Sequence, residues 1–145
     1  MENYENLNGV IVVRKPAGKT SHDMVSFIRK LLHIRRVGHT GTLDPEAVGV
    51  LPICVGICTK ASQYIMDSEK RYVATMQLGA STTTQDASGD MVCSAPICRD
   101  KELILQVISE FIGEIQQIPP MYSAVKVGGK KLYELAREGD RKSVV

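Results

Sequence analysis

The feature that most constrains the fold is a short β-branched run that is broken and followed at once by a helix-starting signal. Residues 9–14 read Gly-Val-Ile-Val-Val-Arg, which predicts a first strand. Proline and glycine within residues 16–18 end this run. The next stretch, Thr20 to Asp23, has the S/T-x-x-D form of a capping box and predicts that a helix follows.

The helix expected after the capping box has apolar residues at helical spacing, which predict one buried stripe along it. The members of this stripe are Met24, Phe27, Ile28, Leu31 and Leu32. Seven basic residues lie between positions 14 and 39, against the single acid Asp23: Arg14, Lys15, Lys19, Arg29, Lys30, Arg35 and Arg36. A basic segment in a chain of net charge +2 suits contact with a phosphate backbone, although a solvated helix face would give the same pattern.

The rest of the chain predicts further strands and helices that alternate with loops. Strands are expected over residues 50–58, 71–78 and 122–127, the last one followed by a Gly128-Gly129 turn. Helices are expected over residues 59–66, 101–112 and 131–138, with Asp100 as the cap of the second and Gly113 at its end. Residues 37–45 and 81–90 are expected to be loops. Together these elements predict an α+β fold with a mixed, largely antiparallel sheet and flanking helices.

Composition is that of an ordinary globular domain. The 145 residues are 43% hydrophobic and 23% charged, and they suffice for one domain with its own core. No stretch approaches the roughly 20 apolar residues that cross a bilayer. The first five residues are polar and acidic, unlike a secretory signal. We therefore expect a cytoplasmic protein without a membrane partner.

The four cysteines raise the question of a metal site. Cys54, Cys58, Cys93 and Cys98 all have apolar neighbours, and none belongs to a paired CxxC knuckle. Free cysteine often behaves as a small buried hydrophobe. Burial is therefore expected for all four, with a zinc site and a disulfide as the weaker alternatives.

A carboxylate, Asp44, lies in a segment punctuated by glycine and proline, between the basic helix and an apolar strand. Such a loop can hold a functional side chain at the surface of a rigid scaffold. An aspartate before a proline is also common in Asx turns, so a purely structural role stays open on these grounds alone.

Five blocks of the sequence, in order from about residue 9 to residue 139, together resemble the TruB type of tRNA pseudouridine synthase. The most specific block is residues 38–52, which closely matches G-H-T-G-x-L-D-P-x-A-x-G-x-L-P. The others are the K-P-x-G run of residues 15–21, the K-R-Y, L-G and T-x-T-x-D stretch of residues 70–86, and residues 117–126 and 132–139. The resemblance implies the pseudouridine synthase fold, with residues 1–145 as the N-terminal portion of its catalytic domain.

The resemblance also implies the chemistry. In this family the aspartate of G-x-L-D-P is the essential nucleophile, so that role falls to Asp44. The reaction breaks the N-glycosidic bond of a uridine, turns the uracil and rejoins it through carbon five, with no metal and no cofactor. Tyr72 of K-R-Y is implied to stack on the target base and to serve in proton transfer, with a half-buried strand tyrosine as the alternative. Whether Asp44 attacks the base or the ribose stays open.

The implied substrate is the T stem-loop of tRNA, with uridine 55 as the expected target. His39 is expected to contact the RNA where the T loop opens, unless it is a turn histidine bonded to backbone. Asp86 of T-x-T-x-D is either a substrate contact or a loop cap. The other implied substrate-binding residues are Lys15, Lys19, Thr40, Gly41, Leu43 and Arg71.

Reaching the target uridine requires flipping it out of its stack, at a cost of a few kcal/mol. Four basic residues can offset this cost through phosphate contacts: Lys15, Lys19, Arg35 and Arg36. The P-I-C-V-G block and the lack of long basic tails favour a stand-alone bacterial enzyme over the guide-RNA-dependent branch of the family that acts on ribosomal RNA.

Full-length members carry a later motif of the G-T-Y-I-R-S-L kind, whose arginine pairs with the nucleophile, and many carry a C-terminal RNA-binding domain. Neither has a match in this sequence. We therefore expect an incomplete catalytic domain with weak or no activity by itself and with exposed sheet edges through which it self-associates. The alternatives to an enzyme are a catalytically incomplete RNA-binding remnant and, against the ordered motifs, an unrelated interaction domain.

Overall fold

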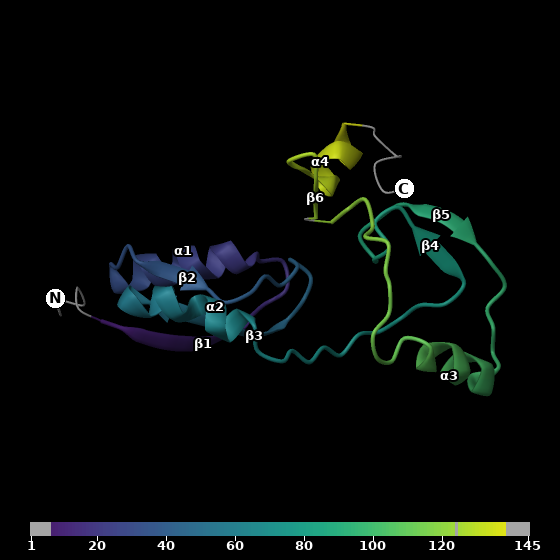
Figure 1. Ribbon diagram of the computed structural model, residues 1–145, viewed down its shortest axis with the longest axis horizontal. Helices are drawn as coiled ribbons and strands as arrows, with labels where there is room; N and C mark the ends of the chain where they lie inside the picture. The colour runs from purple at the N-terminus through teal and green to yellow at the C-terminus, as the bar shows by residue number, and fades with distance from the viewer. Residues whose placement is uncertain (1–6, 124, 139–145) are drawn as a thin grey trace. The chain divides into compact units, whose positions relative to one another are not determined.

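The computed structural model describes residues 7–123 and 125–138, and the chain divides into two compact units (Figure 1). The first unit is Met1–Tyr72 and the second is Val73–Val145. Each unit has its own strands and helices. Across the described ranges, no helix is both long and apolar enough to span a lipid bilayer.

A three-stranded antiparallel sheet is the framework of the first unit. Its strands are β1 (Gly9–Lys15), β2 (Val37–His39) and β3 (Gly49–Val55), in the spatial order β1-β3-β2. Gly9 lies opposite Val55, and Lys15 lies opposite Gly49. The predicted first strand is thus confirmed, and its extension to Lys15 brings the end of β1 beside the start of β3.

Strand β2 lies inside the segment that we predicted to be a loop over residues 37–45, so that prediction is wrong for its first three residues. Val37 pairs with Val55, and His39 pairs with Ile53. Val37 is also buried in the core. Local composition underestimates such a strand, because its stability comes from packing and from a partner strand that follows later in the sequence.

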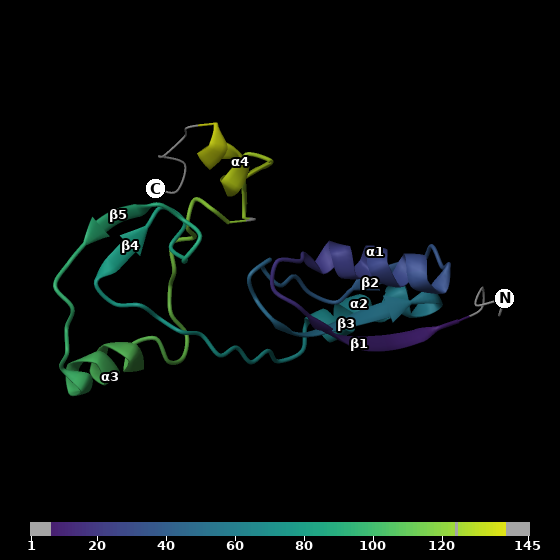
Figure 2. The ribbon, with the colours of Figure 1, turned by 180° about the vertical axis from the view of Figure 1, so that it is seen from behind.

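Helix α1 (Ser21–Leu32) begins with the predicted capping box. The Thr20 hydroxyl accepts a hydrogen bond from the Asp23 amide at 3.0 Å, and the Asp23 carboxylate accepts one from the Thr20 amide at 2.8 Å. These bonds from Thr20 hold the pKa of Asp23 below its usual value. The helix runs along the three strands in both views (Figures 1 and 2).

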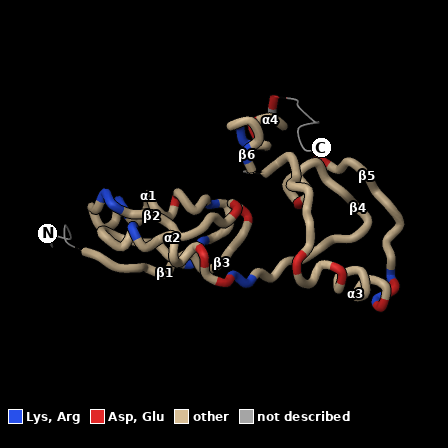
Figure 3. The backbone as a smooth tube through the Cα atoms, viewed as in Figure 1, with Lys and Arg blue, Asp and Glu red and all other residues tan. Residues whose placement is uncertain are grey.

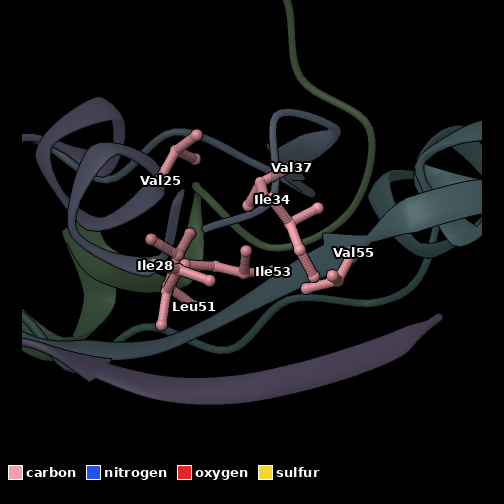
Figure 4. Packing of buried hydrophobic residues seen from close by; sticks show 7 residues of the cluster. All are labelled: Val25, Ile28, Ile34, Val37, Leu51, Ile53 and Val55. Atoms are coloured by element: carbon pink, nitrogen blue, oxygen red, sulfur yellow. The ribbon is translucent and has the colours of Figure 1, made fainter. Parts of the chain in front are cut away.

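The core of the first unit lies between α1 and the sheet (Figure 4). Seven hydrophobic residues form it: Val25, Ile28, Ile34, Val37, Leu51, Ile53 and Val55. Three alternate residues of β3 belong to this layer, namely Leu51, Ile53 and Val55, and Cys54 on the opposite face of the strand is buried as well. Because β3 is the central strand and pairs with both β1 and β2, the packing of β3 in the core also positions these two strands.

The buried stripe that we predicted for α1 is partly wrong. Ile28 is only 5% exposed, whereas Phe27 is 59% exposed and Leu31 also lies open to solvent. The buried face runs instead through Ser21, Val25 and Ile28. Two neighbouring faces of this helix are apolar, and helical spacing alone does not reveal which one meets the sheet.

Strand β3 ends at Val55, before the predicted end of that strand at residue 58. Gly56 has a φ of +62°, and a Cβ atom there would come within 2.1 Å of the Asn8 side-chain oxygen. The same oxygen accepts a hydrogen bond from the Ile57 amide at 2.7 Å. The chain turns here into the 3-10 helix η1 (Gly56–Ala61) and then into α2 (Ser62–Met66), so the predicted helix is present.

The described part of the second unit consists of two hairpins and two helices. Strands β4 (Ala80–Thr82) and β5 (Met91–Ser94) form one antiparallel pair, and β6 (Lys126–Val127) and β7 (Lys130–Lys131) form the other. Helices α3 (Lys101–Ser109) and α4 (Leu132–Arg137) follow β5 and β7 respectively. The predicted Gly128-Gly129 turn is confirmed, with positive φ values of 59° and 86° that suit a two-residue hairpin loop.

Four predictions for the second half of the chain need correction. Of the strand predicted over residues 122–127, only Lys126–Val127 is a strand in the described part of the chain. Residues 71–78 do not form a strand, and Val73 is 99% exposed, because no described strand pairs with this segment. The predicted loop 81–90 contains the end of β4. Helix α3 has the predicted Asp100 cap but ends at Ser109, short of Ile112, and its apolar face is open.

The cysteine prediction holds for one position. Cys54 is buried in β3, and burial raises the pKa of its thiol. Cys58 is half-buried, whereas Cys93 and Cys98 are exposed, so burial was wrongly predicted for that pair. Their apolar neighbours mislead because β5 and the segment after it have no buried face in the described part of the chain.

The expected α+β fold, with largely antiparallel pairing and flanking helices, is confirmed. Pairing in the described strands is antiparallel, and it is distributed over three small sheets.

A pair of substitutions on neighbouring residues of α1 tests which face is buried. Ile28→Ala is expected to lower the free energy of unfolding by about 2–4 kcal/mol, because it leaves a cavity between helix and sheet. Phe27→Ala is expected to cost less than about 1 kcal/mol, because its side chain is already in water. Urea unfolding of both variants measures the difference. Equal losses would contradict the packing in Figure 4.

Candidate active site

Asp44 lies in the connection between β2 and β3, at the end of the sheet where β1 also ends. Its side chain is exposed and forms no hydrogen bond or ion pair with any residue that the structure describes. Only its backbone carbonyl is engaged, by the Ala47 amide at 3.0 Å. The Asp44 side chain therefore does not form the Asx turn of the alternative interpretation, and its carboxylate is exposed to solvent.

The residue that follows Asp44 is held by the buried side chain of Lys15. Lys15 is 0% exposed, and its ammonium donates to three backbone carbonyls: Pro16 at 2.9 Å, Lys19 at 2.5 Å and Pro45 at 2.9 Å. The Gly18 amide donates to the same Pro45 carbonyl at 2.9 Å. The loop after β1 and the loop that carries Asp44 are thereby tied together.

This geometry corrects the phosphate-binding prediction for Lys15. An ammonium group has three N–H donors, and here three carbonyl oxygens accept from it inside the protein. A buried charge of this kind is tolerated because its hydrogen bonds are satisfied. Lys15 therefore supports the loop around Asp44, whereas Lys19, whose side chain is exposed, is accessible to a phosphate.

The residue before Asp44 is held from the other side. Leu43 donates its amide to the Ser21 hydroxyl at 2.9 Å, and the same hydroxyl donates to the Leu43 carbonyl at 3.4 Å. Ser21 is 2% exposed and is the first residue of α1. The sequence prediction included Leu43 as a substrate contact and did not identify Ser21.

Thr40 fixes the start of the loop. It is buried, and both its amide and its hydroxyl donate to the Pro52 carbonyl, at 3.1 and 3.2 Å. Gly41 follows it in a half-buried position. Both residues were predicted to bind substrate. The amide and the hydroxyl of Thr40 both donate to β3, so the observed role of Thr40 is to hold the end of β2 against that strand.

His39 is the last residue of β2 and is half-buried. Its Nδ1 atom is buried and has no hydrogen-bond partner among the described residues. The alternative of a turn histidine bonded to backbone does not describe this residue, because His39 belongs to a paired strand. The contact with RNA predicted for His39 stays a prediction.

Tyr72 and Arg71 lie at the end of the first unit and are exposed, Tyr72 at 66%. Tyr72 forms no hydrogen bond or ring contact with a described residue. It is therefore not the half-buried strand tyrosine of the alternative interpretation. The described structure does not link it to Asp44, so its active-site role stays a prediction.

Asp86 belongs to the second unit, in the turn between β4 and β5. Its carboxylate accepts hydrogen bonds from the Thr84 hydroxyl at 2.6 Å and from the Ser88 hydroxyl and amide at 2.5 and 2.8 Å. The bonds from Ser88 and Thr84 lower the pKa of Asp86. These contacts are those of a loop cap, which was one of the two alternatives for this residue.

Basic residues gather at the C-terminal end of α1 and the turn that follows it (Figure 3). Arg35 and Arg36 are exposed. Arg29 instead reaches across to β2, where its guanidinium donates to the Val37 carbonyl at 2.9 Å. Arg29 therefore has a structural role and does not belong to the predicted basic surface, which sequence spacing did not reveal.

The loop presents two exposed carboxylates, Asp44 and Glu46, and the buried hydrogen bonds of Ser21 and Lys15 hold the two residues that flank Asp44. Within the described ranges, no group of three or more His, Cys, Asp or Glu side chains is arranged to hold a metal ion. A hollow of about 310 Å³, lined by Arg14, Pro16, Ala17 and Val48, borders the two tied loops. The arrangement offers a nucleophile or base that is open to a large substrate.

A family model described as TruB family pseudouridylate synthase (N terminal domain) matches residues 29–144. The chain belongs to the TruB family. Its relatives include proteins named tRNA pseudouridine synthase B from Alkaliphilus oremlandii, 52% identical over 133 residues, and from Bacillus subtilis, 55% identical over 135 residues. Each alignment covers 92% of this chain but 44% of the relative, so the chain spans less than half the length of these TruB proteins.

Solved structures agree with this membership. The structure of an H/ACA RNP bound to a substrate RNA containing 2'-deoxyuridine matches with a TM-score of 0.54 and 37% identity, over 75% of this chain and 29% of that one. The crystal structure of a Cbf5-Nop10-Gar1 complex matches with a TM-score of 0.53 and 36% identity, over 81% and 31%. The TruB resemblance of the sequence motifs and the expected fold are thereby confirmed.

The buried lysine of this TruB chain gives a testable prediction. Lys15→Met keeps the length of the side chain but leaves carbonyl groups without a donor, so the free energy of unfolding is expected to fall by about 1–3 kcal/mol. Lys19→Met makes the same change at an exposed side chain and is expected to shift it by no more than about 0.5 kcal/mol. Thermal unfolding of the two variants measures this contrast, and a stability of Lys15→Met equal to the unmodified chain would refute the role of the ammonium.

Proposed function

We propose that this chain contributes the nucleophile of a tRNA pseudouridine synthase, and that Asp44 is that nucleophile. The observation that carries the proposal is the exposed Asp44 carboxylate, whose two neighbours in the chain are held by the buried side chains of Ser21 and Lys15. A nucleophile that is fixed in its loop but free at its carboxylate suits attack on a large substrate.

The proposed reaction is an isomerisation of a T-arm uridine, with position 55 as the expected target. The N-glycosidic bond breaks, the uracil turns while it stays bound, and a carbon–carbon bond forms between the ribose and carbon five. The proton on carbon five is released and one is taken up at the freed ring nitrogen, so the atoms balance without a redox step. Asp44 supplies the carboxylate for this sequence.

The remaining predicted contacts fit around this reaction. Tyr72 is proposed to stack on the flipped base, and its exposed ring is compatible with that role. His39 is proposed to contact the opened T loop. Lys19, Arg35 and Arg36 are exposed cations that suit phosphate groups of the tRNA.

The second candidate is RNA binding without turnover. It is favoured by one observation, which is that the Asp44 carboxylate has no cationic partner among the described residues. A cation beside a carboxylate stabilises its ionised form and restrains its direction. In this case the basic residues bind folded RNA, and β1 and β2, the edge strands of the sheet in the first unit, offer a route to self-association.

A comparison of two acidic residues in one loop tests the proposed function. Single-turnover formation of pseudouridine is measured on an unmodified tRNA T-arm stem-loop, with the protein in excess. Asp44→Asn is expected to reduce the rate at least about a thousandfold, because an amide is no nucleophile. Glu46→Gln, an exposed neighbour in the same loop, is expected to leave it within about twofold.

The outcomes separate the two candidates. Turnover that survives in Asp44→Asn would contradict the proposal. Binding of the stem-loop without product from either the unmodified chain or its variants would favour the RNA-binding candidate.

A further inference from the structure

We propose that Ser21 is a positioning residue for Asp44, acting through the backbone of Leu43. The inference rests on the proposed function, because it gives Ser21 a role only if Asp44 acts on a substrate. It begins from one hydroxyl group that joins two segments 22 residues apart in sequence.

The Ser21 hydroxyl contacts both peptide groups that flank Leu43. It accepts from the Leu43 amide at 2.9 Å, which is the strong bond, and donates to the Leu43 carbonyl at 3.4 Å, which is a weak one. The amide belongs to the peptide group before Leu43 and the carbonyl to the one that leads into Asp44. One side chain thereby limits both backbone dihedrals of Leu43 and the direction in which the chain enters Asp44.

The Ser21 hydroxyl is available for this role because its neighbour performs the capping. Thr20 is the N-cap of α1, and its side chain accepts from the Asp23 amide. Ser21 is the first residue of the helix, and its hydroxyl does not take part in capping the helix. Its hydroxyl points into the protein, and the residue is 2% exposed.

The other side of Asp44 is held independently. The Pro45 carbonyl accepts from the Lys15 ammonium and from the Gly18 amide, both at 2.9 Å. Loss of the Ser21 bond therefore frees one side of the loop and leaves the other attached. This predicts a loosened loop in a folded protein rather than a general loss of structure.

Amide hydrogen exchange of Leu43, followed by NMR, tests the contact in the chain as it exists. Ser21→Ala is expected to speed exchange at Leu43 about tenfold, the loss of one hydrogen bond, with the β1–β3 amides unchanged. Two controls lie on the same helix. Ser26→Ala removes an exposed hydroxyl, and Thr20→Ala weakens the helix cap without touching Leu43, so neither is expected to change the Leu43 rate.

Turnover provides the functional readout. In the stem-loop assay, Ser21→Ala is expected to lower the single-turnover rate by about tenfold to a hundredfold, with RNA affinity changed by less than about twofold, because the nucleophile is present but misdirected. The inference is overturned if Leu43 exchange is unchanged in Ser21→Ala or equals that of Thr20→Ala. It is also overturned if Ser21→Ala keeps its full rate in a preparation where Asp44→Asn has none.

Failure of the proposed function looks different. If Asp44→Asn retains turnover, Asp44 is not the nucleophile, and Ser21 then has no positioning role even where the exchange result shows the hydrogen bond. If no variant forms product, the exchange result alone decides whether Ser21 orders the loop.

Discussion

The buried ammonium of Lys15 is the interaction on which the rest of the site depends. It lies at the last position of β1 and gathers carbonyls from the loop that leads to α1 and from the loop that carries Asp44. Removing a charge from water is costly, so such a group persists only where its donors are all satisfied. That requirement forces the two loops together, and the Asp44 loop is further bonded to Gly18 of the loop after β1 and to Ser21 of α1. The two residues that flank the exposed Asp44 are therefore held by the buried side chains of Ser21 and Lys15.

Sequence patterns predicted much of the first unit because its local signals agree with its packing. The β-branched run of β1 and the Thr20–Asp23 capping box both act within a few residues, and both are present. Patterns failed where a partner decides the outcome. Val37 joins a strand because β3 lies beside it, and Phe27 faces solvent because the neighbouring stripe of α1 meets the sheet. Residues 71–78 have strand-like composition but lack a described partner.

At the site, too, local sequence motifs were informative, whereas contacts between distant residues were not predictable. The motif around Asp44 predicted a catalytic role for this carboxylate, which stays a prediction, and the chain belongs to the family that the motif indicated. It did not predict that the side chains of Lys15 and Thr40 donate hydrogen bonds to backbone carbonyls, since a sequence does not show which polar groups are buried together. Ser21 supports the loop in the same way, which sequence spacing did not reveal.

The central claim is that hydrogen bonds from the buried Lys15 side chain and from Gly18 to the Pro45 carbonyl fix the Asp44 loop to the loop after β1. Native-state amide exchange of the unmodified protein tests it most directly at Gly18, whose amide donates to the Pro45 carbonyl. The account predicts that the Gly18 amide exchanges about as slowly as the paired amides of β1 and β3, because it opens only when this unit opens. An exchange rate at Gly18 close to that of an unprotected loop amide would contradict the account.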